Sequence, residues 1–151
     1  SRSIKDIRNH YLKVPLYAEC GGMLFLGRTL EDLKGERHKM ANLLPFHSKQ
    51  GALKVGYRQL KGIRNTLLMN KGDSIIGHEF HRWILEIDTS RIDSISQNKY
   101  KELNAPWEVT GWAIQKHIEG WSNSMIHASW IHLHWSSCPK VLHRWHQIIR
   151  T

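Results

Sequence analysis

The spacing of apolar and polar residues predicts helices at both ends of the chain and a sheet between them. Near the start, Ile4, Ile7 and Tyr11 recur every three or four residues, which is typical of one face of a short helix. A buried strand over 16–18 then leads through a sharp turn at 19–22 into a second helix over 23–33, which Gly35 ends. The chain therefore opens with a helix, then a strand, a turn and a second helix.

From residue 40 onward, short apolar segments separated by glycines indicate strands over 52–60, 63–69 and 75–87. The polar segment 89–106 is predicted to be a surface loop, and strand character returns over 107–115 and 124–135. Ser136, Ser137 and a first-turn Pro139 then predict a closing helix that runs to Ile149. At 151 residues this pattern describes one α/β domain.

Composition narrows the class of protein. No apolar run is long enough to cross a membrane, and the opening Ser-Arg-Ser-Ile-Lys is too polar for a secretory signal. We therefore expect a cytoplasmic protein with no membrane segment. Cys20 and Cys138 lie far apart and make no disulfide framework, so either thiol is free for packing or chemistry. We assign Cys138, just before Pro139, to packing.

The charge is strongly positive, with 22 Lys and Arg against 13 Asp and Glu and a formal net charge of +9. Such a positive charge makes nucleic acid a candidate partner. The positive residues, however, are scattered along the chain and form no recognised nucleic-acid-binding motif. Five of the seven tryptophans fall between residues 107 and 135, where alternation favours packing in a sheet over stacking on bases. A solvated basic surface is the favoured interpretation, and a basic nucleic-acid-binding module is kept as the alternative.

The segment Ala18-Glu19-Cys20-Gly21-Gly22 is the strongest chemical signal. Small residues two before and two after Cys20 meet the steric requirement of a nucleophile elbow, in which a strained residue joins a strand to a helix. We expect the helix N-terminus to lower the pKa of the Cys20 thiol. The N–H of Gly21 could face a developing oxyanion.

A cysteine nucleophile needs a base, and the segment 129–134 supplies His132 and His134. On one strand these two side chains would share a face, so one could act as the base and the other as its orienting partner. A zinc site built from these histidines with His78, Glu79 and His81 is the alternative, although the spacing differs from the helical zinc-protease motif. No phosphate-binding loop or dinucleotide fingerprint is present in the sequence, so we expect no nucleotide site in this chain.

Four segments, over 16–27, 55–57, 77–81 and 129–134, together resemble the C-terminal glutaminase domain of the cobyrinic acid a,c-diamide synthase family, a branch of the class I (triad) glutamine amidotransferases. The resemblance implies a three-layer, flavodoxin-like α/β fold, glutamine as substrate and a glutamyl thioester on Cys20. It implies that His132 is the base. Where the wider class has a glutamate two residues after that histidine, this chain has His134, so His134, Glu79 or another group completes the triad. The remaining residues that the resemblance places in oxyanion or substrate binding are Gly21, Gly22, Tyr57, His78, Glu79 and His81, with no metal.

In the complete family enzyme, ammonia from glutamine amidates the a and c carboxylates of a corrinoid or related tetrapyrrole. The resemblance implies that an N-terminal synthetase domain activates those carboxylates with ATP and Mg. It also implies that the glutaminase domain begins earlier, with strands and a glycine-rich turn that donates to the oxyanion hole. Residues 1–151 would then be a partial, N-terminally truncated glutaminase domain with no cofactor of its own.

Overall fold

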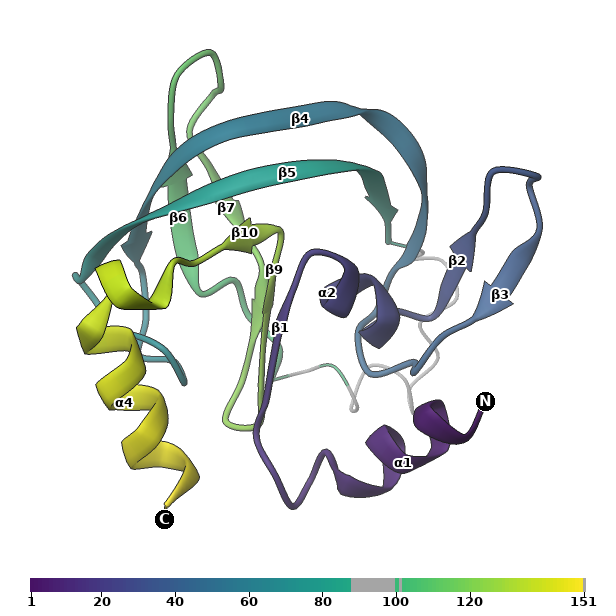
Figure 1. Cartoon of the computed structure of the whole chain (residues 1–151), viewed down its shortest axis with the longest axis horizontal. Helices are drawn as coiled ribbons and strands as arrows, with labels where there is room; N and C mark the ends of the chain where they lie inside the picture. The colour runs from purple at the N-terminus through teal and green to yellow at the C-terminus, as the bar shows by residue number, and fades with distance from the viewer. Residues whose placement is uncertain (88–99, 101, 151) are drawn as a thin grey trace.

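A computed structural model, which describes residues 1–87, 100 and 102–150, folds the chain into two β-sheets with helices packed around them (Figure 1). The smaller sheet has the order β1-β9-β8 and contains β1 (Leu16–Glu19), β8 (Trp121–Ser122) and β9 (Ile126–Ser129). β1 and β9 run parallel, and β8 is antiparallel to β9. Within the described residues, β1 therefore forms one edge of this sheet.

The larger sheet has seven strands in the order β10-β5-β4-β2-β3, with a β6-β7 hairpin attached to β4. Two long antiparallel strands, β4 (His47–Gly62) and β5 (Ser74–Glu86), arch above α2 and the small sheet (Figure 1). The shorter strands are β2 (Thr29–Glu31), β3 (Arg37–Lys39), β6 (Trp107–Thr110), β7 (His117–Glu119) and β10 (Ile131–His132).

The described helices lie at the two ends of the chain and directly after β1. α1 (Arg2–His10) precedes β1, α2 (Gly21–Leu26) follows it directly, and α4 (Pro139–Ile149) comes after the short 3-10 helix η1 (Trp135–Ser137). The core is formed by fully buried side chains from α2, the segment after β3 and both sheets, among them Met23, Leu44, Phe46, Leu60, Trp107 and Ile126. In the part of the chain that is described, no helix is both long and apolar enough to cross a lipid bilayer.

The structure confirms the α/β class and several predicted elements. The opening helix, the strand before Cys20, the two long strands and the closing helix all form. Of the five tryptophans between 107 and 135, Trp107 and Trp121 lie on strands and are at least partly buried, as predicted for sheet packing. Trp130 and Trp135 are at least partly buried outside the strands, and Trp112 is 91% exposed. The loop predicted over 89–106 lies mostly outside the described residues.

The prediction of a second helix over 23–33 is wrong beyond Leu26. The N–H of Gly27 bonds the carbonyl of Leu24 and ends α2, and the chain then enters β2, which pairs in parallel with β4. Leu33 is 77% exposed, so the leucine spacing that suggested a helical face does not mark one. Gly35 has φ +81° and lies between β2 and β3, where it serves the turn of a hairpin.

Three predicted strands also differ from the structure. Segment 63–69 is a turn, because the Thr66 hydroxyl accepts hydrogen bonds from the N–H groups of Leu68 and Met69. The strand predicted over 107–115 ends at Thr110, and a turn with Ala113 at φ +57° follows it. The segment predicted as one strand over 124–135 divides into β9 in the small sheet and β10 in the large sheet. The chain therefore changes sheets immediately before His132.

Candidate active site

Cys20 occupies the turn between β1 and α2 in a strained conformation. Its backbone has φ 47° and ψ −108°, which is unfavourable for a residue with a Cβ and costs on the order of 1–3 kcal/mol. Two hydrogen bonds hold this backbone, from the Cys20 N–H to the Ser129 carbonyl (2.8 Å) and from the Leu24 N–H to the Cys20 carbonyl (3.0 Å). A Cβ added to Gly22 would lie 3.5 Å from the Cβ of Ala18, so strand and helix approach closely here. The strained elbow predicted from the sequence is therefore confirmed.

The Cys20 thiol is half-buried, and its Sγ donates to the Phe80 carbonyl at 3.6 Å. Burial raises the pKa of this thiol, the nearby Gly21 N–H lowers it, and the charge of Glu19 raises it further. The prediction that the helix N-terminus lowers this pKa is wrong, because burial outweighs the backbone N–H of the six-residue α2. A neighbouring base must therefore remove the proton from the resting thiol.

The Glu19 carboxylate faces the His132 ring beside this turn. The Glu19 Oε2 atom lies 3.5 Å from the His132 Nδ1 atom. The other carboxylate oxygen, Oε1, accepts hydrogen bonds from the Leu133 N–H at 2.8 Å and from the Tyr17 hydroxyl. Burial and the Glu19 carboxylate together raise the pKa of Tyr17, which keeps its hydroxyl a donor. Glu19 is thus fixed by its own strand and by the segment that carries His132.

From the sequence, Glu19 was identified only as part of the elbow, and its contact with His132 was not predicted. The signal in the sequence that could have indicated this contact was a carboxylate at the end of a strand, next to the candidate nucleophile. That signal becomes specific only when β1 is known to pair with β9, which places Glu19 opposite Ser129 and near the following residues. His134, the predicted partner of His132, is exposed and its Nδ1 bonds the Ser136 hydroxyl at 2.8 Å.

Three of the predicted site residues line up on the outer face of the large sheet. The register places His132 opposite His78 on β5, and His78 opposite Tyr57 on β4. Residues directly opposite on antiparallel strands share a face of the sheet, so these three rings form a row. The Tyr57 and His78 rings meet edge to face at 5.2 Å, and Tyr57 is 76% exposed. A small molecule beside His132 can therefore reach His78 and Tyr57 from solvent.

Glu79 and His81 lie on the opposite, buried face of β5. The Glu79 carboxylate accepts from Arg58 Nε at 2.7 Å and bonds His81 Nε2 at 2.9 Å, while the His81 ring stacks on Trp130 at 3.7 Å. Burial would raise the pKa of Glu79, but the hydrogen bonds from His81 and Arg58 and their charges bring it to about 2. These two residues were predicted to bind substrate, yet their position is that of a buried network under the open face. Glu79 is also not the carboxylate that contacts His132.

The histidines considered for zinc do not converge on one point. Among the described residues, the one group of three potential ligands close enough to share an ion is Asp32, Glu36 and His38. This group lies in and beside the exposed β2-β3 turn, where Asp32 already accepts two backbone N–H bonds and bonds the His38 ring. Among the described residues, therefore, no group of three potential ligands that could hold zinc includes His132.

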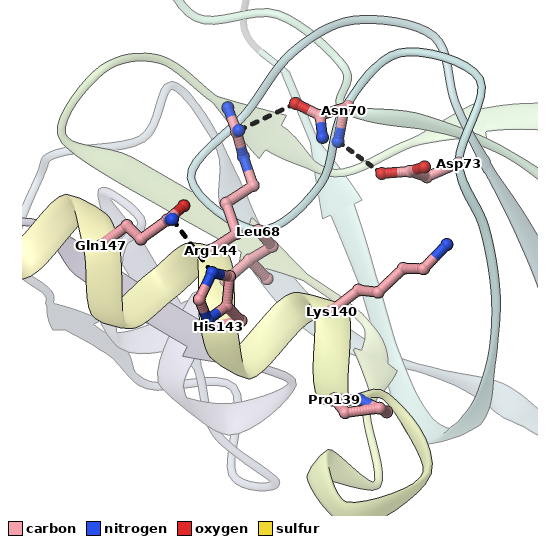
Figure 2. Close-up of a pocket in the computed structure, with 8 residues that line it drawn as sticks. All are labelled: Leu68, Asn70, Asp73, Pro139, Lys140, His143, Arg144 and Gln147. Atoms are coloured by element: carbon pink, nitrogen blue, oxygen red, sulfur yellow. Dashed lines mark hydrogen bonds between the residues drawn. The ribbon is translucent and has the colours of Figure 1, made fainter.

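A pocket of about 470 Å³ lies between α4 and the turn at 66–73, away from the elbow (Figure 2). Arg144 donates to the Thr66 carbonyl at 2.6 Å and to the Asn70 side chain at 2.8 Å, and the Asn70 N–H bonds Asp73 at 2.9 Å. Figure 2 shows Arg144 reaching from the helix to Asn70 in the turn, and Lys140 and His143 also line the pocket. None of the predicted site residues lines this pocket, whose polar groups hold α4 against the domain.

Comparison with known proteins gives a consistent result. The profile of the CobB/CobQ-like glutamine amidotransferase domain matches residues 1–139. Cobyrinate a,c-diamide synthase of Salmonella typhimurium is 36% identical over 138 residues, which cover 90% of this chain and 28% of that protein. The proteins of the same name from Listeria innocua and Saccharolobus solfataricus are each 30% identical, over 88% and 91% of this chain and 27% and 30% of their own lengths. The chain thus spans less than a third of the length of these relatives.

Proposed function

The chain belongs to the CobB/CobQ-like glutamine amidotransferase domain family, and we propose that it releases ammonia from the side-chain amide of glutamine. Cys20 is the nucleophile, His132 the base and Glu19 the group that orients His132. The observation that carries this proposal is the Glu19 carboxylate 3.5 Å from the His132 Nδ1 atom, next to a strained cysteine in a strand-to-helix turn. Nucleophile, base and a third group that orients the base form the general arrangement for thiol catalysis.

The first half of the reaction forms a thioester. Because Glu19 faces the Nδ1 atom of His132, the Nε2 atom is the one that accepts the Cys20 thiol proton. The sulfur then attacks the amide carbon of glutamine, and the oxygen that becomes negative is held by the Gly21 N–H in the first turn of α2, where N–H groups have no helical partner. The C–N bond breaks as the amide nitrogen takes the proton from His132 and leaves as ammonia.

The second half returns the enzyme to its starting state. His132 removes a proton from water, and the resulting hydroxide attacks the thioester carbon. The C–S bond breaks, glutamate leaves, and the thiolate of Cys20 recovers the proton from His132. Tyr57 and His78 lie on the same open face as His132, and we expect them to contact the glutamine.

We further propose that the ammonia is used by another part of the protein, outside the chain described. The relatives are named cobyrinate a,c-diamide synthases, and this chain matches less than a third of each. By extension, the acceptor is the pair of a and c carboxylates of a corrinoid. ATP and Mg would activate those carboxylates in that other part.

The test compares two nitrogen donors in the intact protein. Cys20→Ser should abolish amidation with glutamine but retain amidation with an ammonium salt, because ammonia from solution bypasses the thioester. Cys138→Ser is the matched control, since this second thiol is buried beside α4 and should leave both activities in place. Equal loss of both activities in Cys20→Ser would mean that Cys20 has a structural role only.

A further inference from the structure

Glu119, at the end of β7, accepts hydrogen bonds from three groups that meet at the junction of the two sheets. Its Oε1 atom accepts from the Trp130 N–H at 2.9 Å. Its Oε2 atom accepts from the Ser129 hydroxyl at 2.7 Å and from the Trp107 indole N–H at 2.8 Å. On balance burial raises the pKa of Glu119, although these three donors lower it. A single carboxylate therefore connects β7, β6 and the point where β9 passes into β10.

The peptide group between Ser129 and Trp130 links this carboxylate to the nucleophile. Its N–H donates to Glu119, and its carbonyl accepts from the Cys20 N–H at 2.8 Å. The Cys20 backbone is the strained one at φ 47°, so its conformation persists only while neighbouring groups hold it. Glu119 fixes the orientation of the peptide that does so.

The same carboxylate also reaches the base through the next residues. The Ser129 hydroxyl, which donates to Glu119, accepts from the Ile131 N–H at 2.9 Å, and His132 follows directly. At this junction the chain leaves one sheet for the other, so side-chain oxygens rather than a neighbouring strand take up the N–H groups of Trp130 and Ile131. Glu119 thereby sets the position of the segment that carries His132.

The turn after Glu119 keeps it close to β9. Gly120 has φ +88°, and a Cβ at this position would lie 2.9 Å from the Ala128 carbonyl oxygen. Only glycine fits such an approach without displacing the backbone. The turn at Gly120 therefore has a restricted backbone conformation, and it holds the Glu119 carboxylate at the junction of the two sheets.

We propose that Glu119 is a positioning residue for the glutaminase reaction, because it fixes the Ser129–Trp130 peptide that anchors Cys20 and leads to His132. This inference rests on the proposed function. It adds a group that touches neither substrate nor reacting atoms and that acts through the backbone of the two catalytic residues.

The first test is Glu119→Gln in the intact protein. A carboxamide has one acceptor oxygen, so it cannot serve all three donors, while its size is unchanged. We expect kcat for glutamine hydrolysis to fall about 10- to 100-fold, the range that small misplacements of catalytic groups produce. The KM for glutamine should change less than about threefold, since the substrate contacts remain. Glu108→Gln is the matched control. It removes a carboxylate from β6, next to β7, and this carboxylate pairs with Lys116 rather than with the groups at the junction.

A second measurement does not require glutamine. The rate of Cys20 alkylation by iodoacetamide, followed against pH, reports how the thiol is paired with its base. Glu119→Gln should shift this profile, whereas Glu108→Gln should leave it as in the wild type. Should the wild type fail to hydrolyse glutamine, the proposed function falls, and the alkylation profile still decides the role of Glu119.

Ser129→Ala keeps the test decisive if Glu119→Gln does not fold. It removes the hydroxyl that joins Glu119 to the Ile131 N–H, and should lower kcat and shift the alkylation profile in the same direction. In the double variant the two losses should not add, as expected for residues that act through one connection. An unchanged kcat and alkylation profile in either folded variant would overturn the role of Glu119. A loss of ammonium-dependent activity equal to the loss of glutamine hydrolysis, in either variant, would also overturn the role of Glu119.

Discussion

His127 should make the stability of the small sheet depend on pH. Its side chain is fully buried on β9, and among the described residues neither ring nitrogen has a hydrogen-bond partner. The groups around it are the Tyr17 ring on β1 at 6.0 Å, the Trp107 ring on β6 at 4.7 Å and Ser122, its neighbour in register on β8. Burial lowers the pKa of His127 from 6.5 to about 3. The folded protein therefore holds this imidazole neutral.

The sign and size of the effect follow from proton linkage. Between about pH 6.5 and pH 3 the unfolded state binds a proton at His127 that the folded state does not, so stability falls as the pH is lowered through this window. Each unit below the unfolded pKa removes up to about 1.4 kcal/mol, which gives about 2 kcal/mol between pH 6.5 and pH 5. Above about pH 7 the contribution of His127 should be flat.

Hydrogen–deuterium exchange on peptides from β9, in the intact protein and corrected for intrinsic rates, measures this local stability. The wild type should lose about 2 kcal/mol of protection between pH 6.5 and pH 5 relative to His127→Leu, which cannot titrate. His146→Leu, at an exposed histidine on α4, is the control and should follow the wild type. Equal pH dependence in the wild type and His127→Leu would refute the account of a neutral, unpartnered imidazole.

Other substitutions test the site and its support. His132→Ala should lower glutamine-dependent turnover about 10²- to 10⁴-fold, the usual range for a lost general base, and steady-state rates should show a smaller loss for His134→Ala. A rate for His132→Ala comparable to that of the wild type would remove His132 from the mechanism. Gly77→Ala should also slow turnover, because the added Cβ would lie 2.3 Å from Ile131 Cγ2 and displace β10. An unchanged rate would show that the reaction tolerates this displacement of β10. Glu79→Gln should lower the free energy of unfolding by about 3–5 kcal/mol, as expected when one partner of a buried ion pair is removed. Denaturant titration measures this free energy, and a change below about 1 kcal/mol would contradict the prediction.

The elbow was predictable from the sequence because its determinants are local. A short apolar strand, a cysteine and flanking small residues lie within a few positions of one another, and backbone sterics then dictate the strained turn. The leucines after Gly27 carried an equally local helical spacing. Pairing with the distant β4 outweighed it, and helix propensity cannot report such a contact.

The partners of the proposed catalytic residues were not predictable, because their contacts join segments that are far apart in the sequence. The contacts of Glu19 with His132 and of Glu119 with the Ser129–Trp130 peptide depend on how β1, β7 and β9 meet. The alternation over 75–87 predicted the strand that carries His78 and Glu79, and in the structure these neighbours lie on opposite faces of it. The alternation could not say which face was open until the register with His132 was known.

The glutamyl thioester is the most direct test of the central claim that Cys20 is the nucleophile of a glutaminase. The intact protein is mixed briefly with glutamine, quenched in acid and digested, and the peptides are analysed by mass spectrometry with and without hydroxylamine. A glutamyl group on the peptide that contains Cys20, removed by hydroxylamine and missing from Cys20→Ser, is the predicted result. Ammonia release from glutamine that persists in Cys20→Ser, or a glutamyl group found on Cys138 instead, would contradict it.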